Sequence, residues 1–525
     1  MNQNLVEVLR FWARWQPAKV AVHCEGVEYT WSELDQRTDE LSAGLAAAGV
    51  GRGDVVALVT TNCLEFVEVL FATLKVGGTV APLNIRWTGR ELAHPLRDSA
   101  AKIIVTEKRF LDRMSVVAEE LPEIAIYSRD GGDVLALDTL RSKGSCSPHM
   151  DIEPDATAFL VYSSGTTGFP KGALVTHAGV ISAGIAKVIP NGLTPDDRLL
   201  VTNPLVYTSG CLTKFMETGF MAGAASYLVS EFDPESTLDH IERHKITTMS
   251  SVPIIMERML ASPTFDKRDL SSLKRVWIGG APVSPALLSA WNEQNVPLIQ
   301  AYGLTEISGA CVLILHPDEA WSKAGFAGRP MLFHEVKIAR ADATTAEVGE
   351  VGQVLLRGPA VMKAYLNLPK ETASTLVDGW LCTGDLGFVD ADGYVKIVDR
   401  RNDLIISGGM NIYPAEIERA LSGLTNVDEL AVIGVADQKW GNVPLMVVPD
   451  TSQIDREELA LLCQQELADY KRPRAMVSFG GPLPRTLSGK IEKGALRRKF
   501  EALPTDAVAL SGSRDKAKSG SQPAL

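Results

Sequence analysis

The chain has 525 residues, of which 46% are hydrophobic, and a formal net charge of −12. This length exceeds what one hydrophobic core supports, so we expect several folding units joined into two domains. The acidic balance argues against nucleic acid or an anionic membrane surface as a partner, because both reward clustered positive charge.

The seven cysteines are scattered along the chain without a C-x-x-C pair, which indicates reduced thiols rather than a disulfide framework or a zinc site. The N-terminus has no basic region followed by an apolar one, and no apolar run approaches about twenty residues. We therefore expect a cytoplasmic protein with no integral membrane association.

Strands and helices alternate in the first hundred residues. Residues 20–23 and 27–29 predict a hairpin, and Thr30 and Glu33 form a capping-box pattern at the start of a helix that ends near Gly49. Three further strands are expected, at 54–60, 80–83 and 103–105, the first two flanking a helix at 63–76. This order predicts a doubly wound α/β architecture.

Residues 162–172 combine three glycines, four Ser/Thr hydroxyls and Lys171 directly after an apolar strand. Glycines let backbone N–H groups turn toward an anion, hydroxyls add donors, and the lysine adds charge, so the stretch predicts a phosphate-binding loop. A solvated turn is the alternative. The order is not that of a Walker P-loop, because Gly172 stands where that motif has Ser or Thr.

Two more strands end in residues suited to a ligand. One, at 276–282, ends in a pair of glycines, and the other, at 298–306, ends in an aromatic residue, a glycine and a carboxylate. Ligands of open α/β sheets bind beyond the carboxyl ends of strands, so these ends and the glycine-rich loop are predicted to converge on one cleft.

A solvated helix face is the favoured interpretation of His240 and His244, because a third metal ligand is not evident. The stretch 203–210 is expected to interrupt two helical patterns.

From about Gly325, short alternating strands predict a small antiparallel sheet or barrel, with 378–385 between its strands. A domain boundary is placed at 399–403, followed by a compact α/β unit that has a local basic patch including Lys471.

Six stretches, in this order, resemble the adenylate-forming superfamily and most closely its acyl-CoA and aryl-CoA synthetases: 162–172, 279–282, 302–306, 383–385, 400–414 and 485–490. The resemblance implies an N-terminal domain over 1–399, a hinge at 400–402 and a mobile α+β domain over 403–508. It implies ATP and CoA as co-substrates, Mg²⁺ as cofactor, and two half-reactions that pass through an acyl-adenylate. The Ser-, Gly- and Lys-rich composition of the last residues predicts a disordered tail over 509–525.

The resemblance also assigns roles to single residues. Lys490, Glu306 and Thr166 are the implied catalytic residues, and Thr166 and Glu306 the implied magnesium ligands. The implied ATP-binding residues are Ser163, Ser164, Gly165, Thr166, Thr167, Gly168, Lys171, Gly280, Ala281, Pro282, Tyr302, Gly303, Thr305, Asp385, Arg400 and Lys490. Contacts to CoA are expected from Gly408, Gly409, Trp440, Arg472 and Arg474, although core packing is an alternative for Trp440.

Two positions depart from the family pattern. The hinge residue is Asn402, where relatives usually carry Asp or Lys, and Tyr207 stands where many relatives carry His. Tyr207, Met249, Gly279 and Gly303 are expected to form an acyl pocket for an aryl, phenylpropenoid-like or medium-chain acid. Rival functions are a ligase that loads a carrier protein and a non-catalytic nucleotide-binding paralogue. A homodimer is compatible with the sequence.

Overall fold

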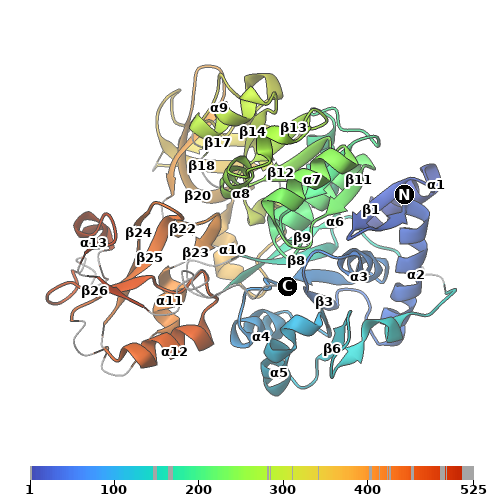
Figure 1. The fold of residues 1–525 in the computed structure, drawn as a ribbon, viewed down its shortest axis with the longest axis horizontal. Coiled ribbons are helices and arrows are strands. Elements are labelled where there is room, and N and C mark those ends of the chain that lie inside the picture. Colours follow the sequence, from blue (N-terminus) through green and yellow to red (C-terminus); the bar gives the residue numbers. More distant parts are fainter. Residues whose placement is uncertain are drawn as a thin grey trace. The chain divides into compact units, whose positions relative to one another are not determined.

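The structure is a computed structural model of the whole chain, shown in Figure 1. It describes residues 3–145, 150–163, 170–280, 283, 285–309, 311–340, 342–400, 405–412, 414–421, 424, 427, 429–450, 454–484, 491, 493–505 and 507–510. These residues form two compact units. Unit 1 comprises Met1–Ile85, Pro95–Ser163 and Lys171–Asp399, and unit 2 comprises Arg86–His94 and the described residues from Arg400 onward.

The first sheet of unit 1 has seven strands in the order β7-β6-β5-β3-β4-β8-β9. All neighbours are parallel except β8 and β9, which form an antiparallel pair around the glycine-rich loop. The strands are β3 (Val55–Val59), β4 (Thr79–Pro82), β5 (Ile103–Thr106), β6 (Ala125–Ser128), β7 (Leu135–Ala136), β8 (Thr157–Ser163) and β9 (Lys171–Thr176), and their helices are α3 (Leu64–Lys75), α4 (Gly89–Asp98) and α5 (Leu111–Glu120).

The second sheet has nine strands in the order β16-β15-β14-β13-β12-β10-β11-β1-β2, with parallel pairing from β14 to β1. Its strands are β1 (Val20–Cys24), β2 (Val27–Thr30), β10 (Arg198–Val201), β11 (Ala225–Leu228), β12 (Thr248–Ser251), β13 (Arg275–Ile278), β14 (Leu298–Gly303), β15 (Cys311–Ile314) and β16 (Arg329–Pro330). The helices between them are α1 (Leu5–Trp15), α2 (Trp31–Ala47), α6 (His177–Val188), the π-helix η3 (Ser209–Phe220), α7 (Pro234–His244), α8 (Pro253–Leu260) and α9 (Pro285–Glu293).

Helix α3 packs between the two sheets and shares one hydrophobic core with both. Every residue of α3 except Glu65 is buried, which is typical of a helix enclosed on all sides. One apolar cluster contains residues of α3, of β3 in the first sheet and of β10 in the second. Helix α2 packs beside α3, and its Thr30 capping box is present as predicted. The strand ends that carry the expected site therefore belong to one packed body.

A third, antiparallel sheet completes unit 1, and unit 2 has a sheet of its own. The third sheet contains β17 (Glu335–Ala339), β18 (Gly352–Arg357), β19 (Leu376–Val377), β20 (Trp380–Val389) and β21 (Val395–Arg400), with α10 (Pro369–Thr375) beside it. Unit 2 contains β22 (Ile405–Ser407), β23 (Met410–Ile412), β24 (Ala431–Asp437), β25 (Gly441–Val448), β26 (Ala475–Ser478), β27 (Val508–Ala509), α11 (Pro414–Ala420), α12 (Arg456–Glu466) and α13 (Lys493–Lys499).

The predicted mixed α/β fold with a small C-terminal part is confirmed, but three local expectations are wrong. Residues 380–385 lie inside β20 and not between strands. The segment at 203–210 follows β10, so it does not separate two helices. Val508 and Ala509 form strand β27, which pairs with β26 at the edge of the unit 2 sheet. The tail that was expected from residue 509 onward therefore begins too early. The rest of that tail, 511–525, lies outside the described residues.

No helix in the part of the chain that the structure describes is long and apolar enough to cross a bilayer.

Candidate active site

Glu306 lies where two sheets of unit 1 meet. It belongs to the short turn after β14, and its carboxylate oxygen Oε1 accepts a hydrogen bond of 3.3 Å from the hydroxyl of Ser163, the last residue of β8. The strand that leads into the glycine-rich loop and the strand that ends in the carboxylate therefore converge. The sequence predicted that three strand ends converge, and this contact brings together two of them, the end of β8 and the end of β14.

A second donor approaches the same carboxylate oxygen. The hydroxyl of Tyr365 donates to Glu306 Oε1 at 2.7 Å. The ring of Tyr365 also lies below the ammonium group of Lys171, whose Nζ is 5.5 Å from the ring centroid. Tyr365 thus contacts both a carboxylate and a lysine that the sequence assigned to the phosphate and metal site.

Tyr302 and Asp385 form the next pair. The Tyr302 hydroxyl donates to the Asp385 carboxylate, and Asp385 is buried in β20, where its N–H donates to the Thr383 hydroxyl at 3.0 Å. The hydroxyl of Thr305 lies 3.2 Å from that of Thr208 at the start of η3. An aromatic ring, an acceptor-only carboxylate and two hydroxyls therefore occur together at the end of β14.

Glycines allow close approach of neighbouring strands at this edge. A Cβ on Gly279 would lie 2.6 Å from the carbonyl oxygen of Ala301, so the end of β13 fits against β14 only without a side chain. Gly280 has a φ of +82°, which favours glycine. Gly303 is the last residue of β14 and pairs with Cys311.

The two side chains expected in the acyl pocket lie in different surroundings. The hydroxyl of Tyr207 donates to the amide oxygen of Asn84 at 3.0 Å, just past the end of β4. Met249 is fully buried in the apolar cluster that also contains Met256 and Trp291, so the structure gives it a packing contact.

In unit 2, Trp440 lies against the glycine turn between β22 and β23. A Cβ on Gly408 would come within 2.7 Å of the Trp440 ring, and Gly408 and Gly409 both have positive φ angles, +56° and +78°. The guanidinium of Arg474 lies over the same ring at 5.9 Å. Gly408, Trp440 and Arg474 are therefore brought together.

Two basic residues of the predicted patch contact other groups of unit 2. Arg472 donates to the backbone carbonyls of Cys463 and Leu467 at the end of α12, at 3.1 and 3.0 Å. The ammonium of Lys471 is buried and paired with the Glu416 carboxylate at 2.5 Å, because an unpaired charge would be costly there. The expectation that Lys471 belongs to a local basic patch is therefore wrong.

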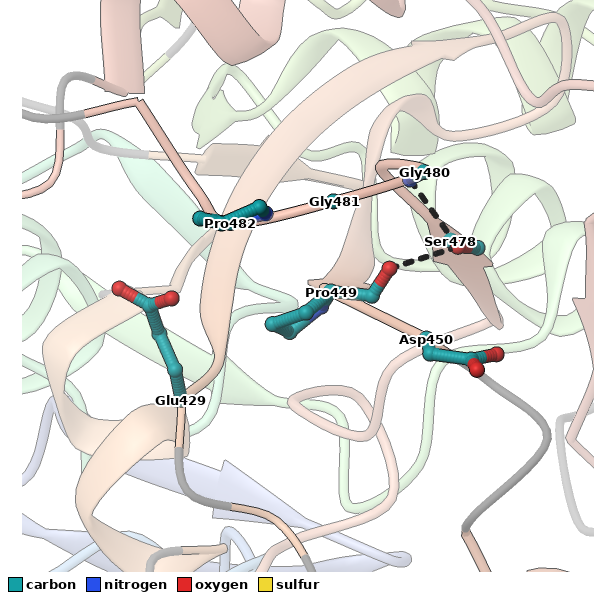
Figure 2. A pocket seen from close by; sticks show the side chains of 7 residues that line it. All are labelled: Glu429, Pro449, Asp450, Ser478, Gly480, Gly481 and Pro482. Atoms are coloured by element: carbon teal, nitrogen blue, oxygen red, sulfur yellow. Dashed lines mark hydrogen bonds between the residues drawn. The ribbon is translucent and has the colours of Figure 1, made fainter.

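One pocket of unit 2 is separate from all of these residues. It has a volume of about 610 Å³ and is lined by Glu429, Pro449, Asp450, Ser478, Gly480, Gly481 and Pro482, as Figure 2 shows. Ser478 and Gly480 are joined there by a hydrogen bond of 3.1 Å. None of the sequence-predicted site residues lines it.

His240 and His244 do not form the solvated face expected of them. Their rings pack against His23 of β1, with the His23 and His244 centroids 4.8 Å apart, and burial lowers the pKa of all three imidazoles. No group of three potential ligands with metal-binding geometry is present among the described residues. The cluster is a packing contact between α7 and the sheet.

Several predicted residues lie outside the described part of the chain or have no described side chain. Ser164, Gly165, Thr166, Thr167, Gly168, Ala281, Pro282, Asn402 and Lys490 fall in the first group, and Arg400 in the second. Sequence reasoning missed two residues that the structure brings to the site, Tyr365 and Asn84. Asn84 follows a strand end, so the rule applied to the other strands would have found it, whereas nothing in the local pattern marks Tyr365.

Two family models match the chain. The AMP-binding enzyme model covers residues 9–366, and the model of the AMP-binding enzyme C-terminal domain covers 416–490. A feruloyl-CoA synthase from an Amycolatopsis species is 38% identical over 491 residues, which are 93% of this chain and 97% of that protein.

Solved structures give the same result. A double mutant of o-succinylbenzoate CoA synthetase (MenE) from Bacillus subtilis, bound with the product analogue OSB-NCoA, matches with a TM-score of 0.85 and 32% identity over 94% of this chain and 98% of that one. The same synthetase in complex with ATP and magnesium ion matches with a TM-score of 0.70 and 31% identity over 93% and 99%. The chain therefore belongs to the adenylate-forming AMP-binding enzymes, in their acyl-CoA and aryl-CoA synthetase branch.

Proposed function

We propose that this chain is an ATP-dependent carboxylic acid–CoA ligase that releases AMP and pyrophosphate. In its first half-reaction a carboxylate attacks the α-phosphorus of ATP and yields an acyl-adenylate; in the second, the CoA thiol displaces AMP and yields a thioester. The observation that carries the proposal is the hydrogen bond from Ser163 to Glu306, because it joins the strand before the glycine-rich loop to a carboxylate at another strand end.

The first half-reaction brings an anion against an anion, so the site must supply positive charge and donors where charge develops. One such group can contribute about 3 kcal/mol to the transition state. Lys490 is the proposed donor to the substrate carboxylate and the α-phosphate. Thr166, Thr167, Gly168 and Lys171 are the proposed partners of the outer phosphates, and Asp385 is the proposed acceptor for the ribose hydroxyls.

Glu306 fits a magnesium ligand. Both hydrogen bonds to its carboxylate end on Oε1, which leaves Oε2 without a donor among the described residues. A hard cation such as Mg²⁺ prefers one or two carboxylates together with phosphate and water oxygens. Glu306 and Thr166 would hold the ion, which would neutralise phosphate charge when bound.

An aryl or phenylpropenoid acid is the proposed substrate class. The similarity to a feruloyl-CoA synthase supports it, and the Tyr207–Asn84 pair brings a hydroxyl and an amide together where the acid is expected to bind. Medium-chain acids remain the alternative. For the acceptor, CoA is favoured over a carrier protein, because Trp440 and Arg474 lie together and offer a ring and a cation to an adenine and its phosphates.

An acid panel tests the proposal. The purified chain is incubated with ATP, Mg²⁺ and CoA together with ferulate, other hydroxycinnamates, benzoate, indoleacetate, octanoate or acetate, and AMP release is measured. We expect ferulate-like acids to exceed octanoate at least about tenfold in kcat/KM, since a shaped pocket distinguishes acids by that order. Replacing CoA with a phosphopantetheinyl carrier protein should abolish release. Absence of acid-dependent ATP–pyrophosphate exchange with every acid would instead indicate a non-catalytic nucleotide-binding protein.

A further inference from the structure

Tyr365 stands between the two charged groups of the proposed phosphate and metal site. Its hydroxyl donates to Glu306 Oε1 at 2.7 Å, and its ring lies 5.5 Å from the ammonium of Lys171. The side chain is 8% exposed, so it makes these contacts from within the protein. We propose that Tyr365 is a positioning residue that orients the Glu306 carboxylate toward a divalent metal and holds Lys171 for phosphate; this role rests on the proposed function.

The backbone around Tyr365 is fixed to both elements that it would position. The N–H of Met362 donates to the carbonyl of Glu306 at 2.8 Å. On the other side, the N–H of Leu366 donates to the carbonyl of Gly172 at 2.7 Å, and the N–H of Lys363 donates to that of Leu174 at 2.8 Å. Residues 362–366 therefore join the turn after β14 to β9, the strand that begins at Lys171.

The ring is fixed as well. Tyr365 packs in a small apolar cluster with Ala173 of β9 and Met362, and its own N–H donates to the hydroxyl of Thr372 at 3.0 Å. A side chain locked in this way places its hydroxyl without further loss of rotamer freedom. It can therefore orient the carboxylate before any ligand arrives, which is the way a rigid supporting shell prepares a binding site.

The hydroxyl and the ring have separate consequences. A hydroxyl donated to one oxygen of a metal-binding carboxylate fixes the direction of the other oxygen, and loss of such outer partners typically weakens metal affinity by about 10–100-fold. A ring below an ammonium attracts it through its negative face, without any metal. Removing the hydroxyl alone should weaken magnesium-dependent binding, and removing the ring should also weaken metal-free binding of ATP.

Isothermal titration of the full chain with ATP, in excess Mg²⁺ and in EDTA, separates these effects without a turnover assay. In Tyr365→Phe we expect the tightening of ATP binding by Mg²⁺ to fall about tenfold relative to wild type, with the Kd in EDTA within about twofold of the wild-type value. Tyr365→Leu should in addition raise the Kd in EDTA, and Glu306→Gln should remove the Mg²⁺ effect.

The matched control is Tyr394→Phe, because the Tyr394 hydroxyl also pairs with a charged side chain, the guanidinium of Arg329, at 2.6 Å in the same unit. It should leave both Kd values unchanged. An unaltered Mg²⁺ effect in Tyr365→Phe, or equal weakening with and without metal, would overturn the role of Tyr365 while leaving the ligase intact. Wild-type protein that binds no ATP, or binds it no better with Mg²⁺, would overturn the nucleotide and metal assignments themselves.

Discussion

At the scale of single residues, Gly408 offers the sharpest test of the proposed CoA contacts. A methyl group there would meet the Trp440 ring at 2.7 Å, where real contacts do not occur, so the ring must move. We expect Gly408→Ala to reduce thioester formation from supplied acyl-adenylate and CoA at least about tenfold, equal to ~1.4 kcal/mol. ATP–pyrophosphate exchange should stay within about twofold, because the first half-reaction does not use the thiol.

Gly480→Ala is the matched control for backbone strain. Gly480 has a φ of +85°, close to the left-handed region of Gly408, but a Cβ there would meet nothing within 4 Å. Both variants therefore carry the unfavourable backbone conformation, and only Gly408→Ala displaces Trp440. Equal rates for the two variants in the second half-reaction would show that the contact has no part in CoA binding.

Sequence reasoning named candidate site residues where a motif carries them and missed those that only the fold places. Glu306, Ser163, Tyr302 and Asp385 were among the predicted residues, and in the structure Ser163 contacts Glu306 and Tyr302 contacts Asp385. Tyr365 was missed because its partners are distant in sequence and its position is set by pairing with β9. Side chains placed by sheet pairing leave no local signature.

At the scale of elements, the first residue of the N-terminal helix α1 is hydrogen-bonded to a buried histidine. His177 begins α6, and its Nδ1 accepts a hydrogen bond of 3.2 Å from the N–H of Leu5, the first residue of α1. Protonation would put a cation against the positive ends of two helices and turn this acceptor into a donor. Burial lowers the pKa of His177 from 6.5 to about 4.

This pKa predicts that acid destabilises the protein through His177. Between pH 6.5 and about 4 the unfolded chain binds a proton that the folded chain does not, so the free energy of unfolding falls as pH falls through this window. The full difference is about 3 kcal/mol. In urea unfolding at pH 7.5 and 4.5, His177→Gln should lose less stability than wild type, by most of that amount.

His316→Gln controls for loss of a histidine cap. His316 is exposed, and its Nδ1 accepts from the N–H of Asp318 at the start of another short helix. Its side chain lies at the surface, so His316→Gln should not reproduce the smaller loss of stability expected of His177→Gln in the same urea experiment. If His177→Gln and wild type lose equal stability in acid, the imidazole of His177 does not titrate as expected.

The sequence predicted regular helices and strands better than it predicted the π-helix η3. Period and capping signals identified α2, α3 and the parallel strands, since these follow from local pattern. The π-helix η3 was not foreseen, although it carries Lys214 and Glu217 fully buried, with Nζ and both carboxylate oxygens lacking hydrogen-bond partners among the described residues. Burial raises the pKa of Glu217 to about 8. Such a helix is selected by tertiary packing, not by residue propensity.

At the scale of the whole molecule, the proposed chemistry divides between two regions of the chain. Unit 1 contains the carboxylate, tyrosines and strand ends that would bind ATP and the acid, and the C-terminal region carries Lys490 together with the Gly408–Trp440 contact. If Lys490 supplies charge only while the carboxylate attacks ATP, the two half-reactions depend on different parts of the C-terminal region. They should then be separable by single substitutions in opposite ways.

Lys490→Ala should lower acid-dependent ATP–pyrophosphate exchange at least about 100-fold, because one donor to the developing charge contributes about 3 kcal/mol. Thioester formation from supplied acyl-adenylate and CoA should stay within severalfold of wild type, since the α-phosphate is already esterified. Lys493→Ala is the control, because that lysine is paired with Glu418 at 2.7 Å and should affect neither step. Equal losses in both half-reactions of Lys490→Ala would contradict the assignment.

The opposite pattern in Gly408→Ala, with exchange retained and thioester formation lost, would complete the separation of the two half-reactions. A general loss of folding cannot explain such a pair of results, because it would not impair a different step in each variant.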